Sequence, residues 1–219
     1  MYKDIKNQLC TACESLVKSN VIPDDAFITI KDCEKQCYAL NNINIPLREV
    51  SESNIIIIGF DGNVVEGDAS GIDPYFKVHK VIYNENDEIT TIIDPRSRYN
   101  SIWASVGRSL VPNSFFYCKS LVGETPVTGT VTLEPGEDLY ETIGASVLAR
   151  LRHKGIQPFG AIIIKNDSAI VWGKTPDSTV KRAIAMEEIC FRALSSAAIT
   201  NGCDSFVALE VASRLLAEE

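Results

Sequence analysis

Hydrophobic positions along the chain follow two alternating spacings, which predicts interleaved helices and strands. Apolar residues three or four apart predict helices over 3–19, 76–83, 99–106, 139–154 and 176–200. Short runs rich in β-branched residues predict strands over 26–31, 55–60, 88–93, 127–133, 161–164 and 169–172. The turn signal Asp61-Gly62-Asn63 predicts a hairpin that resumes at Val64-Val65. Strands followed by single helices, with several hairpins, predict an α/β sandwich whose sheet is mixed or antiparallel.

Composition narrows the class of protein. With 219 residues and 45% hydrophobic content, the chain can bury one sizeable core, and we expect one domain over 1–219. A net charge of −8 without a lysine or arginine cluster argues against nucleic acid or an anionic membrane as a partner. The apolar runs at 55–58 and 161–164 are too short to span a bilayer, and MYKDIKNQL lacks the apolar core of a signal peptide. We therefore expect a cytoplasmic protein with small-molecule or protein partners.

Seven cysteines have no disulfide-framework spacing, so we expect reduced thiols. Cys10 and Cys13 form a CxxC, and Cys33 and Cys37 a CxxxC, which together could supply four zinc ligands. Cys13, however, falls on the apolar face of the first predicted helix. A small core residue is the favoured interpretation of Cys13.

Four segments, taken in order, resemble the class II aldolase/adducin family. "SESNIIIIGFDGNVVEGD" is similar to its strand-turn-strand segment, and "KVHKVIYNENDEITTIID" to its helix followed by the metal-ligand strand. "SIWASVGRSLVP" resembles the next helix and its exit, and "GAIIIKNDSAIVWGKTPDSTVKRAIAMEEICFRA" the long C-terminal module. The resemblance covers nearly the whole chain. It implies a three-layer sandwich with a mixed, mostly antiparallel central sheet and helices on both faces.

The resemblance also implies a zinc site, but the matching positions here carry other residues. The family's metal strand ends in His-x-His and a third histidine opens a later loop; the matches are Asp94, Arg96 and Asp167. The acidic residue four before the helix histidine, which is His79 here, is replaced by Tyr75. Zinc in such a site stabilises the enediolate formed when a carbon–carbon bond breaks. Since the chain has two histidines, one subunit cannot supply three histidine ligands, and we expect no zinc. Arg96 would repel a cation at this site, so we expect no other metal either.

The family's phosphate-binding loops are altered too. The matching positions are Ala26, Phe27, Ile43, Asn44, Asp73 and Pro74. Small residues are lost and a carboxylate is added, which disfavours a phosphate dianion.

Charges at the end of a buried strand are costly unless they are paired. We therefore expect Arg96 to take the place of the zinc ion and to bridge Asp94 and Asp167. An aspartate-based magnesium site is the less favoured alternative, because Arg96 lies within it.

Other candidate residues have simpler interpretations. We expect His79 to be a hydrogen-bonded structural histidine. We expect Tyr75 to be a partly buried aromatic residue that faces the pocket in which the family holds its metal. Trp172 is expected in the core or a subunit interface, and Glu187-Glu188 on a solvated helix face. The resemblance implies a cyclic homotetramer, for which Trp103 and Phe115-Phe116-Tyr117 could supply interface surface.

Three functions remain open at this point. The chain could be a metal-free, catalytically inactive family member that binds a small ligand or a protein partner. It could be an aldolase- or epimerase-type lyase with altered, metal-independent chemistry, using Tyr75, Asp94, Arg96 or Asp167. It could also be an ordinary metal-dependent enzyme whose site is hidden, which the histidine count disfavours. Fold alone does not separate the first two.

Overall fold

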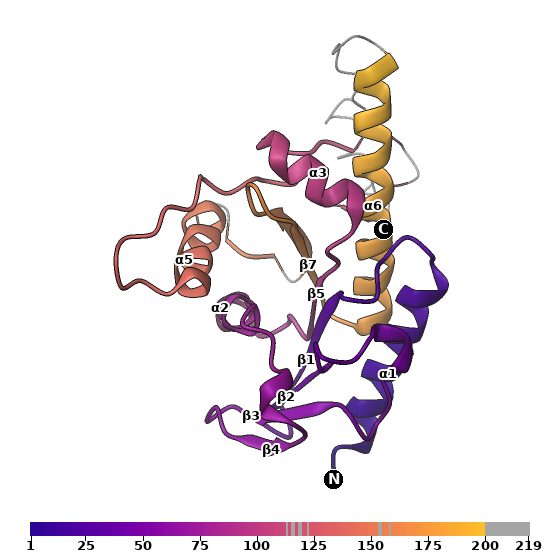
Figure 1. Ribbon diagram of the computed structural model, residues 1–219, viewed down its shortest axis with the longest axis vertical. Coiled ribbons are helices and arrows are strands. Elements are labelled where there is room, and N and C mark those ends of the chain that lie inside the picture. The colour runs from indigo at the N-terminus through magenta and orange to yellow at the C-terminus, as the bar shows by residue number, and fades with distance from the viewer. Residues whose placement is uncertain are drawn as a thin grey trace.

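The computed structural model of the protein describes residues 1–112, 114, 117, 120–121, 123–152, 155–157 and 159–199. Its strands are β1 (Phe27–Asp32), β2 (Cys37–Leu40), β3 (Ile56–Gly59), β4 (Val64–Glu66), β5 (Thr91–Asp94), β6 (Gly160–Ile163) and β7 (Ala169–Gly173). Its helices are α1 (Lys3–Lys18), α2 (Phe76–Glu85), α3 (Arg98–Val106), α5 (Leu139–Leu151) and α6 (Pro176–Ile199), with 3-10 turns η1 (Leu47–Glu49) and η2 (Ala69–Gly71). Figure 1 shows their arrangement.

The described strands form one sheet in the order β4-β3-β2-β1-β5-β7-β6. Every strand pair in it is antiparallel. Strand β1 lies at the centre, with Phe27 opposite Asp94 of β5 and Asp32 opposite Cys37 of β2. The start of β1 therefore lies beside the end of β5, and the end of β1 lies beside the start of β2, at the opposite end of the strands.

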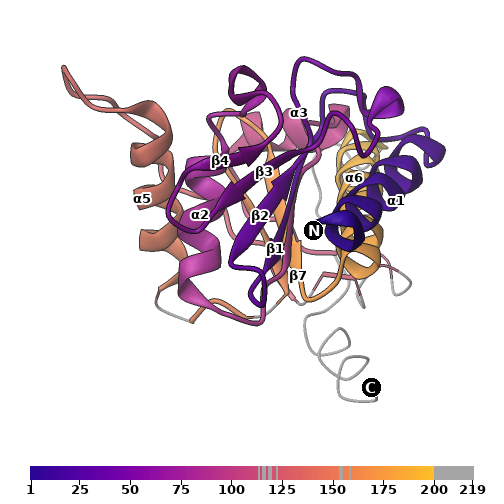
Figure 2. The ribbon, with the colours of Figure 1, turned by 90° about the horizontal axis from the view of Figure 1, so that it is seen from below.

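Helices cover both faces of the sheet, as the view in Figure 2 shows. One core lies under α1 and α6 and includes Leu9, Ile28 and Met186. The other lies under α2 and α5 and includes Phe27, Ile82 and Val147. Neighbouring residues of β1 point into opposite cores because side chains alternate across a strand. The three-layer α/β sandwich expected from the sequence is confirmed.

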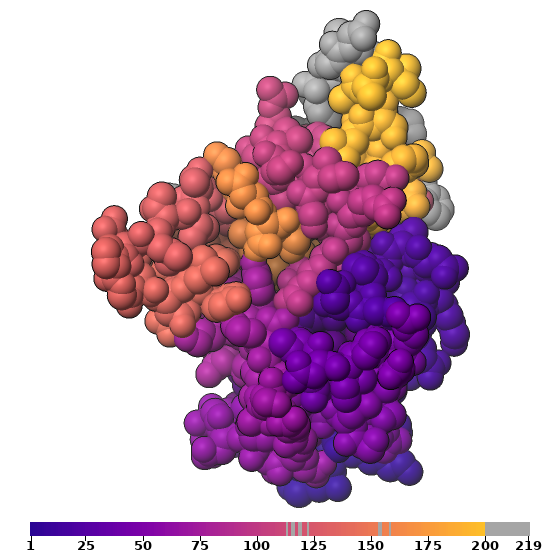
Figure 3. Space-filling view, in the orientation of Figure 1, coloured from indigo at the N-terminus to yellow at the C-terminus, as the bar shows by residue number. Residues whose placement is uncertain are grey.

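Helix α6 runs along one face of the sheet and continues beyond it, at the top of Figures 1 and 3. It contacts α1, α3, β5 and β7. Its inner side is buried through Ala193, whereas Ile199 is 82% exposed. Among the described residues, no helix combines the length and apolarity that a bilayer span requires.

Three local predictions need correction. The strand expected over 127–133 is reduced to a single parallel bridge between Val127 and Ile163, with Gly129 and Pro135 nearby in a stretch of irregular backbone. Strand β2 was not predicted, because its four residues CYAL carry no alternation that marks a strand. Trp103 does not supply interface surface: it is 6% exposed within its own chain, and its indole N–H donates to the Arg108 carbonyl. Phe115 and Phe116 lie outside the described residues.

Candidate functional site

The chain turns sharply where β5 ends, and this turn builds the centre of the site. Asp94 is the last residue of β5, Pro95 cannot continue the strand's hydrogen bonds, and Arg96 follows with φ of 46°. A positive φ is uncommon for a residue with a long side chain, and strained backbone of this kind is enriched at functional sites. The turn brings the backbone N–H of Arg96 to 3.3 Å from the Asp94 carboxylate, and its Nε to 3.0 Å.

The guanidinium of Arg96 also contacts two other segments. Its Nη2 donates to the carboxylate of Asp73, and its Nη1 donates to the Asp25 carbonyl at 3.3 Å. Asp73 is fixed at the start of α2, where its carboxylate accepts the backbone N–H of Tyr75 at 2.8 Å. The Asp94 and Asp73 side chains are 1% and 5% exposed, and that of Arg96 is 26% exposed. Arg96 thus links two buried carboxylates. We call Asp73, Asp94 and Arg96 the ion-pair cluster.

The second carboxylate of the cluster is Asp73, so the expected pairing of Arg96 with Asp167 is wrong. Asp167 lies in the turn between β6 and β7 with an exposed side chain that makes no hydrogen bond or ion pair among the described residues. Its neighbour Ser168 reaches the cluster instead, and its Oγ donates to Asp94 at 2.7 Å. The turn is therefore close to the cluster, but it presents a hydroxyl instead of a carboxylate.

The cluster perturbs the pKa values of its members. Burial raises the pKa of Asp94 above its ordinary value, against the opposing effect of Arg96. Burial likewise raises the pKa of Asp73, again opposed by Arg96. Burial alone would lower the pKa of Arg96, but the carboxylates of Asp94 and Asp73 raise it instead. The guanidinium is therefore held in its charged form.

Tyr75 caps the N-terminus of α2, and His79 lies in the first turn of that helix, where its N–H donates to the Tyr75 carbonyl at 3.0 Å. The guanidinium carbon of Arg96 is 5.6 Å from the centre of the Tyr75 ring, and the His79 ring stacks on Phe27 at 5.0 Å. His79 Nδ1 is 3.0 Å from the Thr29 hydroxyl, as expected for a structural histidine. Burial, with Arg96 as the second cause, lowers the pKa of His79 to about 3. The imidazole is therefore neutral.

Two buried polar atoms in this region have no hydrogen-bond partner among the described residues. They are the Tyr75 hydroxyl oxygen and His79 Nε2. Buried polar groups are normally satisfied, and exceptions often mark a binding or reacting group. Tyr75 is the N-cap residue of α2 and His79 lies in its first turn, so both atoms are close in sequence to Asp73, which binds Arg96.

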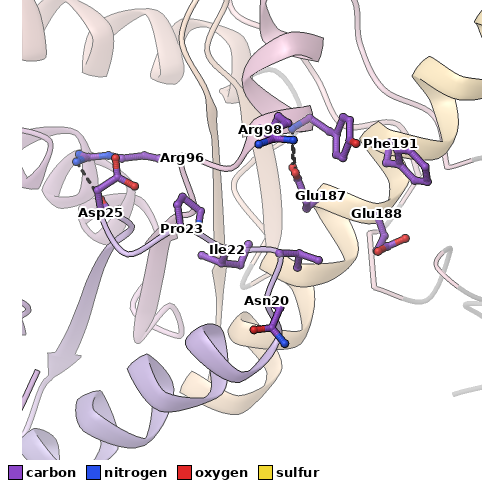
Figure 4. Close-up of a pocket in the computed structure, with 11 residues that line it drawn as sticks. Asn20, Ile22, Pro23, Asp25, Arg96, Arg98, Glu187, Glu188 and Phe191 are labelled. Carbon is purple, nitrogen blue, oxygen red and sulfur yellow. Dashed lines mark hydrogen bonds between the residues drawn. The ribbon is translucent and has the colours of Figure 1, made fainter. Parts of the chain in front are cut away.

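A groove of about 650 Å³ opens beside the cluster (Figure 4). Arg96 and the loop from Asn20 to Asp25 form one side of it, and Glu188 and Phe191 of α6 form the other. Arg98 and Tyr99, at the start of α3, complete the lining. The Arg98 side chain has no hydrogen bond or ion pair within the described part of the chain, which leaves a cation available at the groove.

Glu187 is buried, so the expectation that Glu187 and Glu188 form a solvated helix face is wrong for Glu187. It is 3% exposed and caps the N-terminus of α3. Its carboxylate accepts the backbone N–H groups of Tyr99 and Asn100, both at 2.9 Å, and the Ser97 hydroxyl at 2.6 Å. A carboxylate at a helix N-terminus satisfies unpaired N–H groups and the helix dipole. Glu188 is the partly exposed member of the pair.

The positions that match the phosphate loops are only partly gathered at the site. Phe27 contacts His79, Ala26 is buried next to Asp25, and Asp73 with Pro74 precedes α2, whose Phe76 N–H donates to the Asp73 carbonyl. Ile43 and Asn44 pack instead against the 3-10 turn η2: the Ile43 N–H donates to the Gly71 carbonyl, and the Asn44 amide to the Ser70 carbonyl. No described contact joins Ile43 or Asn44 to Arg96.

The cysteine and tryptophan candidates belong to the scaffold. Cys10, Cys13, Cys33, Cys37 and Cys190 are free thiols. Cys13 and Cys37 are buried, and burial raises the pKa of both thiols. Trp172 is 2% exposed, and its indole N–H donates to the Gln157 carbonyl at 2.9 Å.

Sequence reasoning missed the roles of Asp73, Ser168, Ser97 and Glu187 in this region. From the sequence, Asp73 stands out only as a position of the lost phosphate loop. The one usable signal is its place three residues before the helix predicted from residue 76, where aspartate commonly accepts a backbone N–H. Glu187 carried no such signal, because it caps a helix nearly ninety residues away in the sequence, and only the packing of α3 on α6 brings them together.

Solved structures support the fold assignment. An L-fuculose 1-phosphate aldolase superposes with a TM-score of 0.77 at 18% identity, covering 98% of this chain and 95% of that one. L-fuculose 1-phosphate aldolase from Glaciozyma antarctica PI12 gives 0.75 at 22% identity, covering 97% and 80%. An aldolase II superfamily protein from Pseudomonas syringae gives 0.75 at 16% identity, covering 99% and 85%. At these identities the likeness concerns the fold alone.

A family model matches most of the chain and not only single motifs. The family described as Class II Aldolase and Adducin N-terminal domain matches residues 7–194, which includes the ion-pair cluster, the groove and every strand that the structure describes. The chain belongs to the class II aldolase and adducin family.

Proposed function

We propose that this chain is a non-canonical family member that has lost the zinc site and the phosphate loop and binds a small ligand without a metal. The observation that carries the proposal is the bonding of the Arg96 guanidinium to both Asp73 and Asp94. The resemblance places two zinc-ligating histidines at the positions of Asp94 and Arg96. The Arg96 guanidinium is a fixed cation at these positions, and it supplies the positive charge that the zinc ion supplies in the family.

The residues present do not fit zinc. Structural and catalytic zinc sites use three or four histidine, cysteine or carboxylate ligands around an open centre. Here both carboxylates are bonded to Arg96, which cannot ligate a cation and would repel one. Among the described residues, no group of three or more His, Cys, Asp and Glu side chains is placed to hold a metal.

The groove suggests the class of ligand. Arg96 and Arg98 line it beside the exposed ring of Phe191, and Asn20 adds an amide. A guanidinium pairs well with a carboxylate through two parallel hydrogen bonds. Asp25 and Glu188 also line the groove and would repel a dianion such as a phosphate ester. A small, unphosphorylated hydroxy acid fits this lining best.

We further propose a cytoplasmic homotetramer, as the resemblance implies. The partly buried Tyr117, near the start of the C-terminal half, and the part of α6 that extends past the sheet would lie at subunit contacts. Light scattering at micromolar concentration tests the assembly. A mass of one chain would contradict it.

A second candidate is a lyase of the aldolase or epimerase type with metal-independent chemistry. The specific observation in its favour is the pair of unpartnered buried atoms, the Tyr75 hydroxyl oxygen and His79 Nε2. Arg96 is 5.6 Å from the Tyr75 ring and could stabilise a developing oxyanion, while the phenol moves a proton. In that reaction Asp94 would hold the Arg96 guanidinium in position through its hydrogen bond to Nε.

One assay separates the candidates. The protein is incubated with L-fuculose 1-phosphate, and with its unphosphorylated sugar, either after dialysis against a chelator or with added zinc. The ligand-binding proposal predicts no cleavage in any sample, together with binding of D-glycerate in chelator that Arg98→Gln weakens and Arg48→Gln does not. Cleavage in chelator that Tyr75→Phe abolishes would favour the lyase. Cleavage that requires zinc would contradict both.

A further inference from the structure

A second hollow lies at the opposite end of the sheet from the ion-pair cluster. Its volume is about 620 Å³, and its lining is Lys31, Cys33, Tyr38, Phe60, Lys80, Tyr83, Asn84 and Asp87. Lys31 and Tyr38 are partners in the β1–β2 ladder, at the end of β1 remote from Phe27 and Asp94. No residue of this hollow lines the groove beside Arg96.

One wall of the hollow is aromatic and combines Tyr38 of β2, Phe60 directly after β3, and the rings of α2. The Tyr38 ring contacts Phe60 at 4.8 Å, Phe76 at 5.3 Å and Tyr83 at 5.4 Å between ring centres. Tyr38 is 5% exposed, whereas Phe60 is 39% exposed. The aromatic cluster thus ends in one open ring, on which a planar group can stack in an offset or edge-to-face geometry.

Two lysines line the same hollow, but only one is neutralised. The Lys31 ammonium pairs with Asp87 at 3.0 Å and donates to the Tyr83 carbonyl at 3.3 Å. The Lys80 ammonium lies 5.9 Å from the centre of the Phe76 ring and has no carboxylate or hydrogen-bond partner among the described residues. The hollow therefore carries a net positive charge in a protein whose formal net charge is −8.

We propose that this hollow binds a planar aromatic carboxylate. The ring of the ligand stacks on Phe60, and its carboxylate pairs with the Lys80 ammonium. Asp87, on the rim, repels a second negative charge, so a monoanion is preferred over a nucleoside phosphate. This site is independent of the function proposed for the groove.

Cys33 supplies a local probe, because its exposed thiol lines the hollow. A ligand seated on Phe60 and Lys80 should slow alkylation of Cys33 by iodoacetamide, measured by mass spectrometry of the peptide that contains it. Alkylation of Cys10, which lies on α1 away from the hollow, should not change. This measurement uses the parent protein and needs no variant.

The test compares 2-naphthoate with two relatives that each lack one feature. 2-Naphthamide keeps the rings without the charge, and cyclohexanecarboxylate keeps the charge without an aromatic ring. Calorimetric titration should detect the naphthoate, with affinity at least about tenfold above either relative, because the amide loses the charge-assisted contact and the cyclohexane loses the stacking contact. Equal affinity for naphthoate and naphthamide would overturn the proposal.

Variants assign the contacts. Lys80→Met and Phe60→Leu should each lower naphthoate affinity by about tenfold and restore alkylation of Cys33. Lys77→Met is the matched control: it lies on the same helix, but its ammonium faces Asp138 and Glu141. Arg98→Gln, in the groove, should also leave naphthoate binding unchanged. Naphthoate binding that survives Lys80→Met, or that is lost in Arg98→Gln, would place the ligand elsewhere and refute the assignment.

Discussion

The Nε of Arg96 lies 3.0 Å from the carboxylate of Asp94, only two residues earlier in the chain. This short-range pair becomes a buried cluster because the loop before α2 brings Asp73 to the Nη2 of the same guanidinium. The cluster lies at the carboxyl end of β5, next to the groove.

Arg96→Met should lower the free energy of unfolding by about 3–5 kcal/mol at pH 7, the scale for removing one partner of a buried ion pair. The variant leaves Asp73 and Asp94 buried without their cation. Equilibrium unfolding in urea measures the change, and the loss should be smaller at pH 5, where the stranded carboxylates can take up protons.

Arg48→Met is the control for that variant. Arg48 pairs with Asp24 at 2.5 Å, but its side chain is 62% exposed, so we expect a change below about 1 kcal/mol. An Arg96→Met protein as stable as Arg48→Met would show that the cluster contributes nothing to stability.

Tyr75→Phe should leave stability unchanged within about 0.5 kcal/mol, because the hydroxyl that it removes has no partner among the described residues. Tyr83→Phe is the matched comparison. The Tyr83 hydroxyl donates to the Thr29 carbonyl at 2.9 Å in the same core, so its loss should cost about 1–2 kcal/mol. Thermal unfolding of both variants checks this difference. A Tyr75→Phe variant as unstable as Tyr83→Phe would mean that the Tyr75 hydroxyl is bonded in the folded protein.

Glu187→Gln should destabilise the protein by about 1–3 kcal/mol, since the charged cap of α3 is lost while its N–H groups remain buried. Glu188→Gln, one residue along the same helix, should change the free energy of unfolding by less than about 0.5 kcal/mol. Urea unfolding of the pair gives the comparison. Equal effects would contradict the capping role.

His79 should make the protein sensitive to acid. The pKa of His79 is lowered to about 3 in the folded state, against about 6.5 for an unfolded histidine. Between these pH values the unfolded chain binds the extra proton, so stability falls as pH decreases from about 6.5 toward 3. His79→Gln should flatten that slope. Unfolding measured at half-unit pH steps tests it, and identical slopes in parent and variant would rule His79 out.

The sequence was sufficient for the layers of the fold because hydrophobic spacing marks long helices and buried strands directly. The helix over 3–19 and the strand pair around residue 165 agree with α1, β6 and β7 within a few residues. Strand β2 was missed because its identity comes from pairing with β1 and β3 on both sides, a contact that four residues cannot encode alone.

The site was predictable only where its contacts are local in the chain. Asp94 and Arg96 are separated by one proline, so their pairing could be expected from the sequence. The second carboxylate that binds Arg96 could not be predicted, because it depends on which loop reaches the guanidinium in the fold. The loop before α2 supplies Asp73, whereas the β6–β7 turn places Ser168, and not its neighbour Asp167, at the cluster. Side chains one residue apart in a turn point in different directions, which a resemblance of segments does not resolve.

The central claim is that Arg96 replaces the family's metal ion, and the metal content of the purified protein tests it most directly. The protein is dialysed against buffer containing zinc and then against metal-free buffer, and its zinc is measured by elemental analysis alongside Arg96→Met. The account predicts far less than one zinc per chain in the parent. One zinc per chain, removed by a chelator with a drop in thermal stability, would contradict it.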